Sequence, residues 1–294
     1  MKIADTLHDL KTQGIDIADP SSITDFLRCA RYFQHRHEEG LSRLDTTPGY
    51  GLQFGISLHK ALADWYINRD TQKAIDIFKV DFMPFQEPST FHKRSGKELP
   101  ATYTIIYGCS LLLLYFTHYA KDTRKVLEVE IPLADELADN IYLVGRIDLI
   151  LDDNPPVFVD HKSTKYPDRF NINPNLQFMA YKFLCSKLTG KDIAGELDLL
   201  VVAKTKDPQD LLFRRPFDYS KDQMSAWQES VMSHMTAIRA CRASGFWPQS
   251  WRCLEYFQKC AYLPLCTSPR QDSAMKLKET MYTVSFWNPL QIGA

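Results

Sequence analysis

Hydrophobic positions in the amino-terminal part of the chain recur at helical spacing. In SSITDFLRCARYFQHRH, residues 21–37, apolar side chains follow a Ser/Thr cap signal, which predicts a helix that begins near Ser22. FGISLHKALADWYINR, residues 54–69, and TYTIIYGCSLLLLYFTHYA, residues 102–120, predict two more helices, and the second is apolar enough to be buried. Residues 83–102 are rich in Pro, Ser and charge, which predicts an excursion over the surface.

After residue 125 the hydrophobic period changes from that of helices to that of strands. Three β-branched runs, separated by the turn signals DELADN and DDNPP, predict three antiparallel strands in a meander. A helix with a proline in its first turn, two further strands and a long amphipathic helix follow. The runs, in chain order, cover residues 126–133, 140–151, 155–163, 173–188, 196–204, 211–219 and 222–243. Helices, a sheet and then helices predict one α/β or α+β domain with a helical cap, and no linker or internal repeat divides it.

Composition and charge narrow the class of protein. With 45% hydrophobic and 24% charged residues, the 294-residue chain is typical of globular proteins. No window approaches the roughly 20 apolar residues of a membrane span, and the start of the chain lacks the apolar region of an export signal, so we expect a cytoplasmic protein without a membrane partner. The formal charge of −1 provides no global basic field, so nucleic acid would have to bind a local patch.

Two carboxylates and a lysine stand on neighbouring predicted strands in GRIDLILDDNPPVFVDHKST. Residues two apart share a face of a strand, so Asp160 and Lys162 point the same way, and the hairpin can bring Asp148 beside them. Two close carboxylates tolerate one another best with a divalent cation between them, and hard oxygen ligands suit Mg²⁺ or Mn²⁺. The plainer alternative is that the carboxylates are solvated and that Lys162 pairs with one of them.

This pattern resembles the RecB-type branch of the PD-(D/E)XK nucleases, which carry G-x-x-D and then an apolar strand ending in D/E-x-K. Two further matches lie outside the hairpin: the family's G-x-x-x-H helix at Gly55 to His59, and its Q-x-x-x-Y helix at Gln177 to Tyr181. Positions i and i+4 share one helical face, so Gln177 and Tyr181 can present their polar ends together. Taken singly, each of these is more often a surface or rim residue.

The resemblance implies a restriction-endonuclease-like core with a mixed central sheet flanked by helices. It implies a single nuclease domain over 1–294, with a helical part at 21–124, a catalytic core at 125–217 and a helical, cysteine-bearing segment at 218–294. His59, Asp148, Asp160 and the backbone carbonyl of His161 would be metal ligands for Mg²⁺ or Mn²⁺; Lys162 would act on the attacking water, and Gln177 and Tyr181 would contact the substrate or steady the site. An Asp rather than the commoner Glu at position 160 leaves the number of metal ions open.

Four of the seven cysteines lie towards the two ends of the chain. WRCLEYFQKCAYLPLC holds Cys253, Cys260 and Cys266, and Cys29 lies in the first predicted helix. Four thiolates hold either Zn²⁺ or a [4Fe–4S] cluster. One cysteine before the core and three after it resemble the iron-sulfur subgroup that includes the AddB nuclease domain and the CRISPR-associated exonucleases, although C-x6-C departs from its usual C-x2-C. Zinc and unligated buried thiols remain alternatives.

The loop STKYPDRFNINPN interleaves cations with rings and lies next to the predicted catalytic strand. Lys165, Tyr166 and Arg169 suit a strand of nucleic acid, with charge for phosphate and rings for base stacking; the alternative is a solvated loop. The resemblance implies a metal-dependent deoxyribonuclease, an exonuclease on single-stranded ends in recombination, repair, or phage or CRISPR DNA processing, with a possible helicase partner. A non-catalytic nucleic-acid-binding or assembly module and a metal-stapled interaction protein are the competing hypotheses. Polarity, strand preference and oligomeric state stay open.

Overall fold

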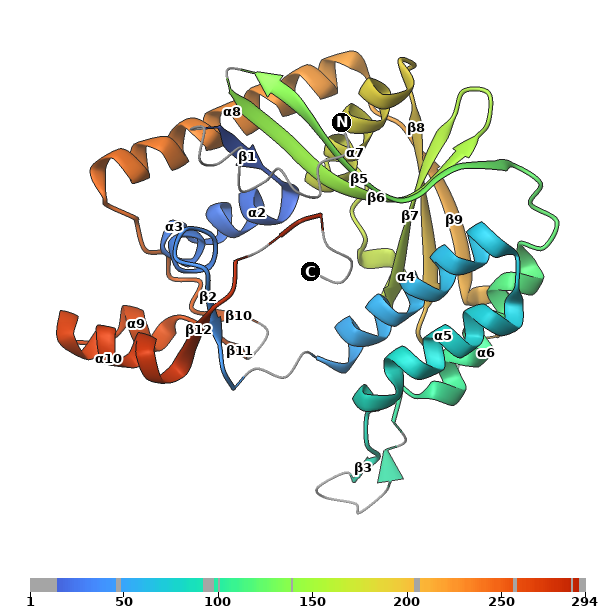
Figure 1. The fold of residues 1–294 in the computed structure, drawn as a ribbon, viewed down its shortest axis with the longest axis horizontal. Coiled ribbons are helices and arrows are strands. Elements are labelled where there is room, and N and C mark those ends of the chain that lie inside the picture. Colours follow the sequence, from blue (N-terminus) through green and yellow to red (C-terminus); the bar gives the residue numbers. More distant parts are fainter. Residues whose placement is uncertain are drawn as a thin grey trace.

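A mixed six-stranded sheet lies at the centre of the protein, whose computed structural model describes residues 15–45, 49–91, 98–99, 101–138, 140–203, 207–255, 258–286 and 288–290. The strands are β1 (Asp16–Ala18), β5 (Lys125–Ala138), β6 (Ile141–Asp152), β7 (Val157–Thr164), β8 (Ala194–Val201) and β9 (Leu212–Phe217). Their order is β1-β6-β7-β8-β9, and β5 lies along the other edge of β6. The predicted mixed α/β class, with a central sheet flanked by helices, is confirmed (Figure 1).

Strand pairing follows the order of the predicted meander. β5 pairs antiparallel with β6, and β6 pairs antiparallel with β7, as the alternation of the sequence predicts. β7 and β8 run parallel, so the chain must cross over between them, and helix α7 (Leu176–Thr189) makes that crossover. β9 then pairs antiparallel with β8.

One edge of β6 has a break in its pairing within the described sheet. At its start, residues 141–143 pair with β1, and at its end, residues 149–151 pair with β7. Residues 144–147 between them pair only with β5 on the opposite edge. The side of β6 around Asp148 is therefore open to ligands rather than covered by another strand.

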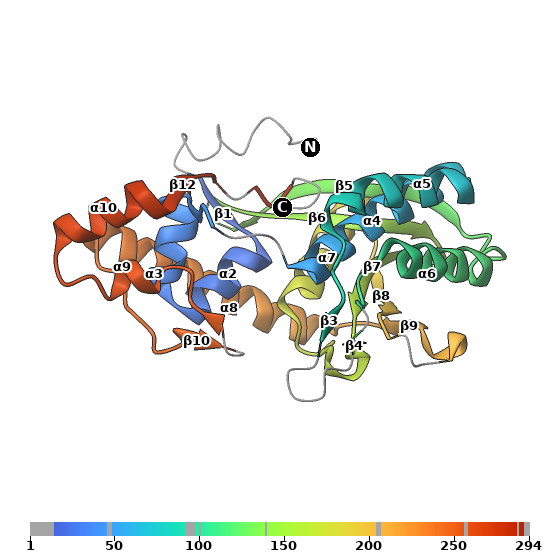
Figure 2. The same ribbon diagram turned by 90° about the horizontal axis from the view of Figure 1, so that it is seen from below.

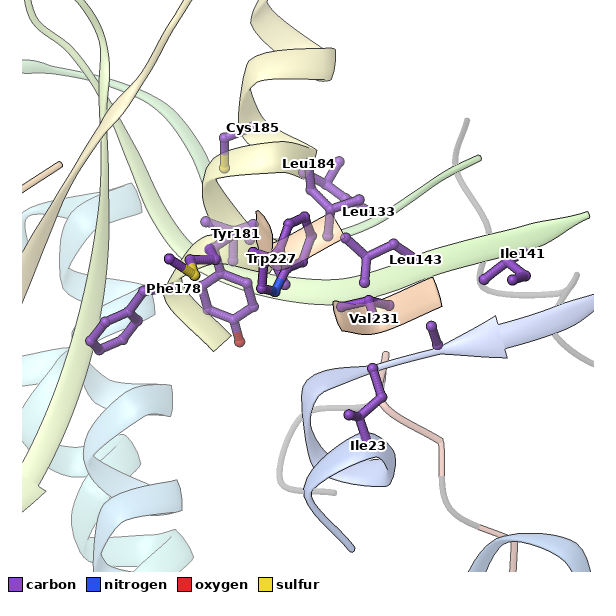
Figure 3. Close-up of a cluster of buried hydrophobic side chains, with 14 of the residues drawn as sticks. Ile23, Leu133, Ile141, Leu143, Phe178, Tyr181, Leu184, Cys185, Trp227 and Val231 are labelled. Atoms are coloured by element: carbon purple, nitrogen blue, oxygen red, sulfur yellow. The ribbon is translucent and has the colours of Figure 1, made fainter. Parts of the chain in front are cut away.

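Helices cover both faces of the sheet, and each face has its own hydrophobic core. α4 (Tyr50–Asn68), α5 (Thr71–Phe82) and α6 (Ile105–His118) pack against one face, and α7 with α8 (Lys221–Ser244) packs against the other. Figure 2 shows the first group as a layer along the sheet, and Figure 3 shows the second core, where Tyr181 of α7 lies close to Trp227 of α8 and Leu143 of β6. In the part of the chain described, no helix is both long enough and apolar enough to cross a membrane.

A smaller unit, called here the cysteine lobe, joins segments from both ends of the chain. It comprises α2 (Pro20–Arg28), α3 (Ala30–Phe33), a π-helix (Gln34–Glu38), β2 (Leu41–Arg43), β10 (Leu254–Glu255), β11 (Gln258–Lys259), α9 (Leu263–Cys266), α10 (Gln271–Met281) and β12 (Tyr282–Val284). β12 pairs antiparallel with β2, so the two ends of the chain share a small sheet. Figures 1 and 2 both place this lobe beside the main sheet, with α8 running between them.

Several sequence predictions need correction. The helix predicted near Ser22 begins at Pro20 with Asp19 as its cap, and it does not continue to residue 37 because Cys29 is extended (φ −168°). The Arg31 N–H there donates to the Pro248 carbonyl at 3.1 Å, so contact with the other end of the chain overrides the local helical period. DELADN is mostly strand, since β5 runs to Ala138 and pairs there with β6.

Other departures are smaller. Pro174 precedes α7 rather than lying in its first turn, and Asn175 caps the helix. The predicted surface excursion contains a 3-10 turn (Met83–Phe85) and a short hairpin of β3 (Thr90–Phe91) and β4 (Glu98–Leu99), while 92–97 and 100 lie outside the described residues. Two remaining 3-10 turns cover Pro167–Arg169 and Pro208–Asp210.

Candidate active site

A cavity of about 640 Å³ lies over the open edge of β6 and holds most of the residues singled out in the sequence. Its lining includes His59, Asp148, Lys162, Lys165, Tyr166, Gln177 and Tyr181. The start of α2 and Pro289 complete the wall on the side of the cysteine lobe. Gly55 lets α4 lie close to β7, because a Cβ there would be 3.0 Å from the Ser163 hydroxyl.

Three potential ligands converge at the floor of this cavity. His59 Nδ1 lies 3.5 Å from Asp148 Oδ2 and 3.9 Å from Glu130 Oε1. Within the described residues, His59, Glu130 and Asp148 form the one group of three His, Cys or carboxylate ligand atoms that all lie within 4.8 Å of one another. An imidazole and two carboxylates make a donor set for a divalent cation.

Glu130 was missed in the sequence analysis. It stands in the middle of VLEVEIPL, where a charged residue reads as the solvent-facing half of a strand alternation. In the structure it has a positive φ of 48°, uncommon for a residue with a side chain, and it lies where β5 passes Asp148 of β6. Its departure from regular strand geometry brings its carboxylate to the site, and no spacing rule could have shown this.

Asp160 and Lys162 share one face of β7, as the strand period predicts. Lys162 Nζ donates to Asp160 Oδ1 at 2.9 Å and lies 2.8 Å from Oδ2. Asp160 is fully buried, and its Oδ2, although close to the ammonium, accepts no hydrogen bond from the described residues. A buried carboxylate oxygen without a hydrogen bond normally costs free energy, and a bound cation would satisfy it.

Backbone geometry places Asp148 against β7, the strand that carries Asp160 and Lys162. The β6–β7 ladder ends at the pair Leu149 and Val159, and one residue further on Asp148 Oδ2 accepts the His161 backbone N–H at 2.8 Å. The Asp148 carboxylate thus takes the place of the next ladder bond. The role of the His161 carbonyl as a metal ligand stays a prediction.

Charges within the site shift the pKa values of its groups in opposite directions. Burial alone would raise the pKa of Asp148, but the charge of His59 and the hydrogen bond from His161 together outweigh it and hold the pKa well below its usual range. Burial and the charge of Asp148 raise the pKa of Glu130. Burial also raises the pKa of Asp160. Burial alone would lower the pKa of Lys162, but the charges of Asp160 and Asp148 together keep it above its ordinary value, so Lys162 is an ammonium at neutral pH.

The two polar residues of α7 meet each other at the cavity. Gln177 Nε2 donates to the Tyr181 hydroxyl at 2.8 Å, as expected for positions i and i+4. Gly145 of β6 allows Tyr181 to lie close, because a Cβ at Gly145 would be 3.1 Å from the tyrosine ring. The Tyr181 hydroxyl therefore faces the cavity while its ring is buried in the core between α7 and the sheet.

At the mouth of the cavity, cations lie over aromatic rings. Lys165 Nζ lies 4.5 Å from the centre of the Tyr103 ring, and the Arg169 guanidinium lies 4.4 Å from that of Tyr166. Tyr166 is 58% exposed. Tyr103, which the sequence analysis did not single out, comes from the segment before α6 and lines the same cavity.

Behind β7, on the side away from Asp160, a buried polar network supports the strand. His161 Nε2 lies 3.3 Å from the Tyr115 hydroxyl, which donates to the fully buried Asp198 at 2.6 Å. Arg214 also donates to Asp198, at 2.8 Å, and to Asp122, at 2.8 Å. The network ties β7, β8 and β9 to α6 and fixes the backbone that carries the site residues.

The four end-cluster cysteines line one small cavity in the cysteine lobe. Cys29, Cys253, Cys260 and Cys266 surround a space of about 120 Å³, and all four thiols are free. Burial raises the pKa of Cys260, and it raises that of Cys266 to about 11. Of the remaining three, Cys185 and Cys241 are buried in the core that α7 and α8 form with the sheet, and Cys109 packs against the core on the other face, as expected for packing residues.

Comparison with known proteins identifies the class to which this fold and site belong. Residues 19–267 match the family model described as the PD-(D/E)XK nuclease superfamily. The match includes the cavity residues named above except Pro289, and all four cysteines of the cysteine lobe. The chain belongs to the PD-(D/E)XK nuclease superfamily, whose members are metal-dependent nucleases.

One solved structure agrees with the fold. The crystal structure of a candidate exonuclease from Eubacterium rectale matches with a TM-score of 0.51 at 12% identity, over 92% of this chain and all (100%) of its own. A second structure, of SSO0001, matches at 12% identity over 80% of this chain and 88% of its own, with a TM-score of 0.32 that is too low to support an argument. A search of curated proteins gave no match.

Proposed function

We propose that this protein is a divalent-metal-dependent deoxyribonuclease of the RecB-like branch, acting as an exonuclease on single-stranded ends. The observation that carries the proposal is the convergence of His59, Glu130 and Asp148 over the open edge of β6. The buried Asp160 oxygen that accepts no hydrogen bond from the described residues supports the same site. These donors fit Mg²⁺ or Mn²⁺, which prefer carboxylate oxygen and tolerate imidazole.

The residues of the chain divide the work of phosphodiester hydrolysis. His59, Asp148, Asp160 and the His161 carbonyl would hold the cation, with Glu130 as a further ligand. The cation would supply a Lewis acid for the phosphate and lower the pKa of a bound water. Lys162, held as an ammonium, would orient the attacking water and offset phosphate charge. Gln177 and Tyr181 would contact the substrate backbone.

A single strand of DNA suits the mouth of the cavity. Lys165 and Arg169 provide local positive charge that the whole chain lacks, and Tyr166 offers an exposed ring for base stacking. A helicase or recombination partner that unwinds duplex DNA would supply such a strand. The Eubacterium rectale protein of similar fold is named a candidate exonuclease, and its likeness to this chain supports cleavage from ends.

The test is incubation with end-labelled linear single-stranded, linear duplex and circular single-stranded DNA, with Mn²⁺ or Mg²⁺. We expect linear single strands to be shortened from one end and circles to persist. Cleavage that continues undiminished in excess chelator would contradict metal-dependent hydrolysis. Binding of DNA without cleavage under every metal condition would instead favour the non-catalytic module.

For the cysteine lobe we propose a [4Fe–4S] cluster held by Cys29, Cys253, Cys260 and Cys266. Tetrahedral zinc binds sulfur at about 2.3 Å, which brings its sulfurs to roughly 3.8 Å from one another. In the described residues no three cysteine sulfurs lie within 4.8 Å of one another, although all four line one cavity. A cluster binds each thiolate at a different iron, so its ligands stand further apart. Stoichiometric zinc without iron or acid-labile sulfide in the purified protein would overturn this assignment.

A further inference from the structure

The segment that follows β12 returns from the cysteine lobe to the 640 Å³ cavity of the candidate active site, called here the catalytic cavity. At its start, the Ser285 N–H donates to the Gly40 carbonyl at 2.7 Å, which extends the pairing of β12 with β2. At the other end, Leu290 is only 5% exposed and packs against Ala134 and Val144 of the sheet. The segment, called here the strap (residues 285–286 and 288–290), is thus fastened on both sides of the cavity that Pro289 lines.

Arg146 joins the strap to the candidate cation site. Its Nη1 donates to the Leu290 backbone carbonyl at 2.7 Å, and its Nε donates to Glu130 Oε2 at 2.6 Å. The guanidinium is planar and its donors are rigidly spaced, so fixing one N–H orients the other. The second oxygen of the same carboxylate, Glu130 Oε1, is the one that faces His59 at 3.9 Å.

The contact between Arg146 and Glu130 matters because neither side chain would hold its position without the other. Arg146 is partly exposed, and a free arginine side chain has about 2 kcal/mol of rotamer entropy to lose on being ordered. Glu130 lies on a backbone with positive φ, which persists only where the surroundings fix it. The buried Leu290 side chain provides the free energy that seats the strap carbonyl against Arg146.

We propose that the strap is a positioning element of the metal site: when it is seated, Leu290 fixes Arg146, and Arg146 fixes Glu130 for cation binding. This inference rests on the divalent-cation site proposed above. Detachment of the strap would leave the other cation ligands in place but free Glu130 to reorient, and cation affinity would fall. Arg146 is then a positioning residue, since it reaches the cation only through Glu130.

The test measures Mn²⁺ affinity of the full chain by calorimetry or by electron paramagnetic resonance of free Mn²⁺, without DNA. Leu290→Asn should detach the strap without adding charge. We expect it to raise the Mn²⁺ dissociation constant about 10-fold, the usual cost of losing a residue that orients a metal ligand. Arg146→Gln should have an effect of similar size. Val284→Asn is the matched control, because Val284 is 64% exposed in β12 just ahead of the strap, and it should leave the affinity unchanged.

Coupling decides whether the strap acts through Arg146. In the double variant, Leu290→Asn should add nothing to Arg146→Gln, whereas independent effects would multiply. A shortened chain that ends at Ser285 lacks residues 286–294 and with them the Leu290 anchor, so its Mn²⁺ affinity should match that of Leu290→Asn.

Each remaining outcome supports or contradicts the proposal that the strap positions Glu130 through Arg146. Unchanged affinity in the shortened chain would overturn the proposal, and so would multiplicative effects in the double variant. Asp148→Asn separates this inference from the proposed function. If Asp148→Asn leaves Mn²⁺ binding intact, the cation site itself is wrong. If Asp148→Asn weakens binding while the strap variants do not, only the strap is wrong.

Discussion

The catalytic cavity and the cysteine cavity are built in different ways from the same chain. The proposed site residues from Glu130 to Tyr181 come from adjacent strands and the crossover helix, and of the proposed set only His59 comes from further away. The cysteines come from opposite ends, since positions 29 and 253 are 224 apart (253 − 29). Sheet pairing sets the geometry of the first site, whereas long-range packing between the chain ends sets that of the second.

The two cavities also differ in how their polar groups are satisfied. In the catalytic cavity, carboxylates pair with His59, Lys162 and Arg146, so the charges are largely balanced within the protein. In the cysteine cavity the thiol contacts are weak, such as Cys253 Sγ to the Ser250 carbonyl at 3.6 Å. We infer that the first site folds without its cation and that the second depends on its metal for stability.

The largest expected effect concerns the catalytic cavity. Lys162→Ala should lower the cleavage rate by about 10²- to 10³-fold, the usual cost of losing one electrostatic contact to a transition state. DNA binding and iron content should change little, but the melting temperature should fall, because the fully buried Asp160 carboxylate loses its ammonium partner. Single-turnover cleavage measures the effect, and Lys191→Ala, an exposed lysine outside the cavity, is the control. A near-normal rate would remove Lys162 from the mechanism.

The next effect concerns the cysteine cavity. Cys260→Ser should lose iron and lower the free energy of unfolding by about 5 kcal/mol, by analogy with a cross-link that closes a loop longer than about 100 residues. The folded fraction should still cut DNA. Iron analysis and urea denaturation provide the measurements, with Cys109→Ser, outside the cavity, as the matched control. Full iron content in Cys260→Ser would contradict the ligand assignment.

A smaller effect tests the network behind β7. Hydrogen bonds from Arg124, and then Arg214, hold the pKa of Asp122 well below its ordinary value. A depressed pKa stabilises the fold above the unfolded value of about 3.9, and this contribution is lost as the pH falls further. Asp122→Asn should therefore cost about 1 to 3 kcal/mol at pH 7, and this cost should begin to decline below about pH 3.9, so that it is smaller at pH 3 but not yet lost. Urea denaturation at both pH values measures it; an equal loss at both would exclude this linkage.

The smallest effect concerns the mouth of the catalytic cavity. Lys165→Ala combined with Arg169→Ala should flatten the salt dependence of single-strand binding, by a slope of about 1.4 for two phosphate contacts. Mn²⁺ affinity should not change. Binding titrations across salt concentrations measure the slope, and an unchanged slope would assign these cations to packing on Tyr103 and Tyr166 alone.

Most of the fold could be predicted from periodicity, and the failures have a common cause. The meander of β5, β6 and β7 and the helices α4, α7 and α8 follow local patterns of apolar residues. The break at Cys29 could not be predicted, because it depends on contact with Pro248. Strand β1 and helix α5 were not predicted from the sequence either. For β1 the reason is that three residues carry too little periodicity to identify a strand.

The residues of the candidate site also divide into those that local periodicity predicts and those that depend on tertiary contacts. Spacing rules found Asp148, Asp160 and Lys162 because strand alternation fixes which of them share a face. They could not find Glu130, which reaches the site through an irregular backbone, or Arg146, whose partners are Glu130 and the Leu290 carbonyl. Residues whose role depends on tertiary contacts are invisible to a periodic pattern.

The left-handed backbone at Glu130 has a consequence for engineering. Glycine adopts a positive φ without steric cost, so Glu130→Gly would relieve strain of the order of 1 kcal/mol. A selection for thermal tolerance alone would therefore tend to favour glycine at this position, at the expense of the carboxylate beside His59. At position 130, selection for heat resistance would favour glycine, whereas selection for catalysis would favour glutamate.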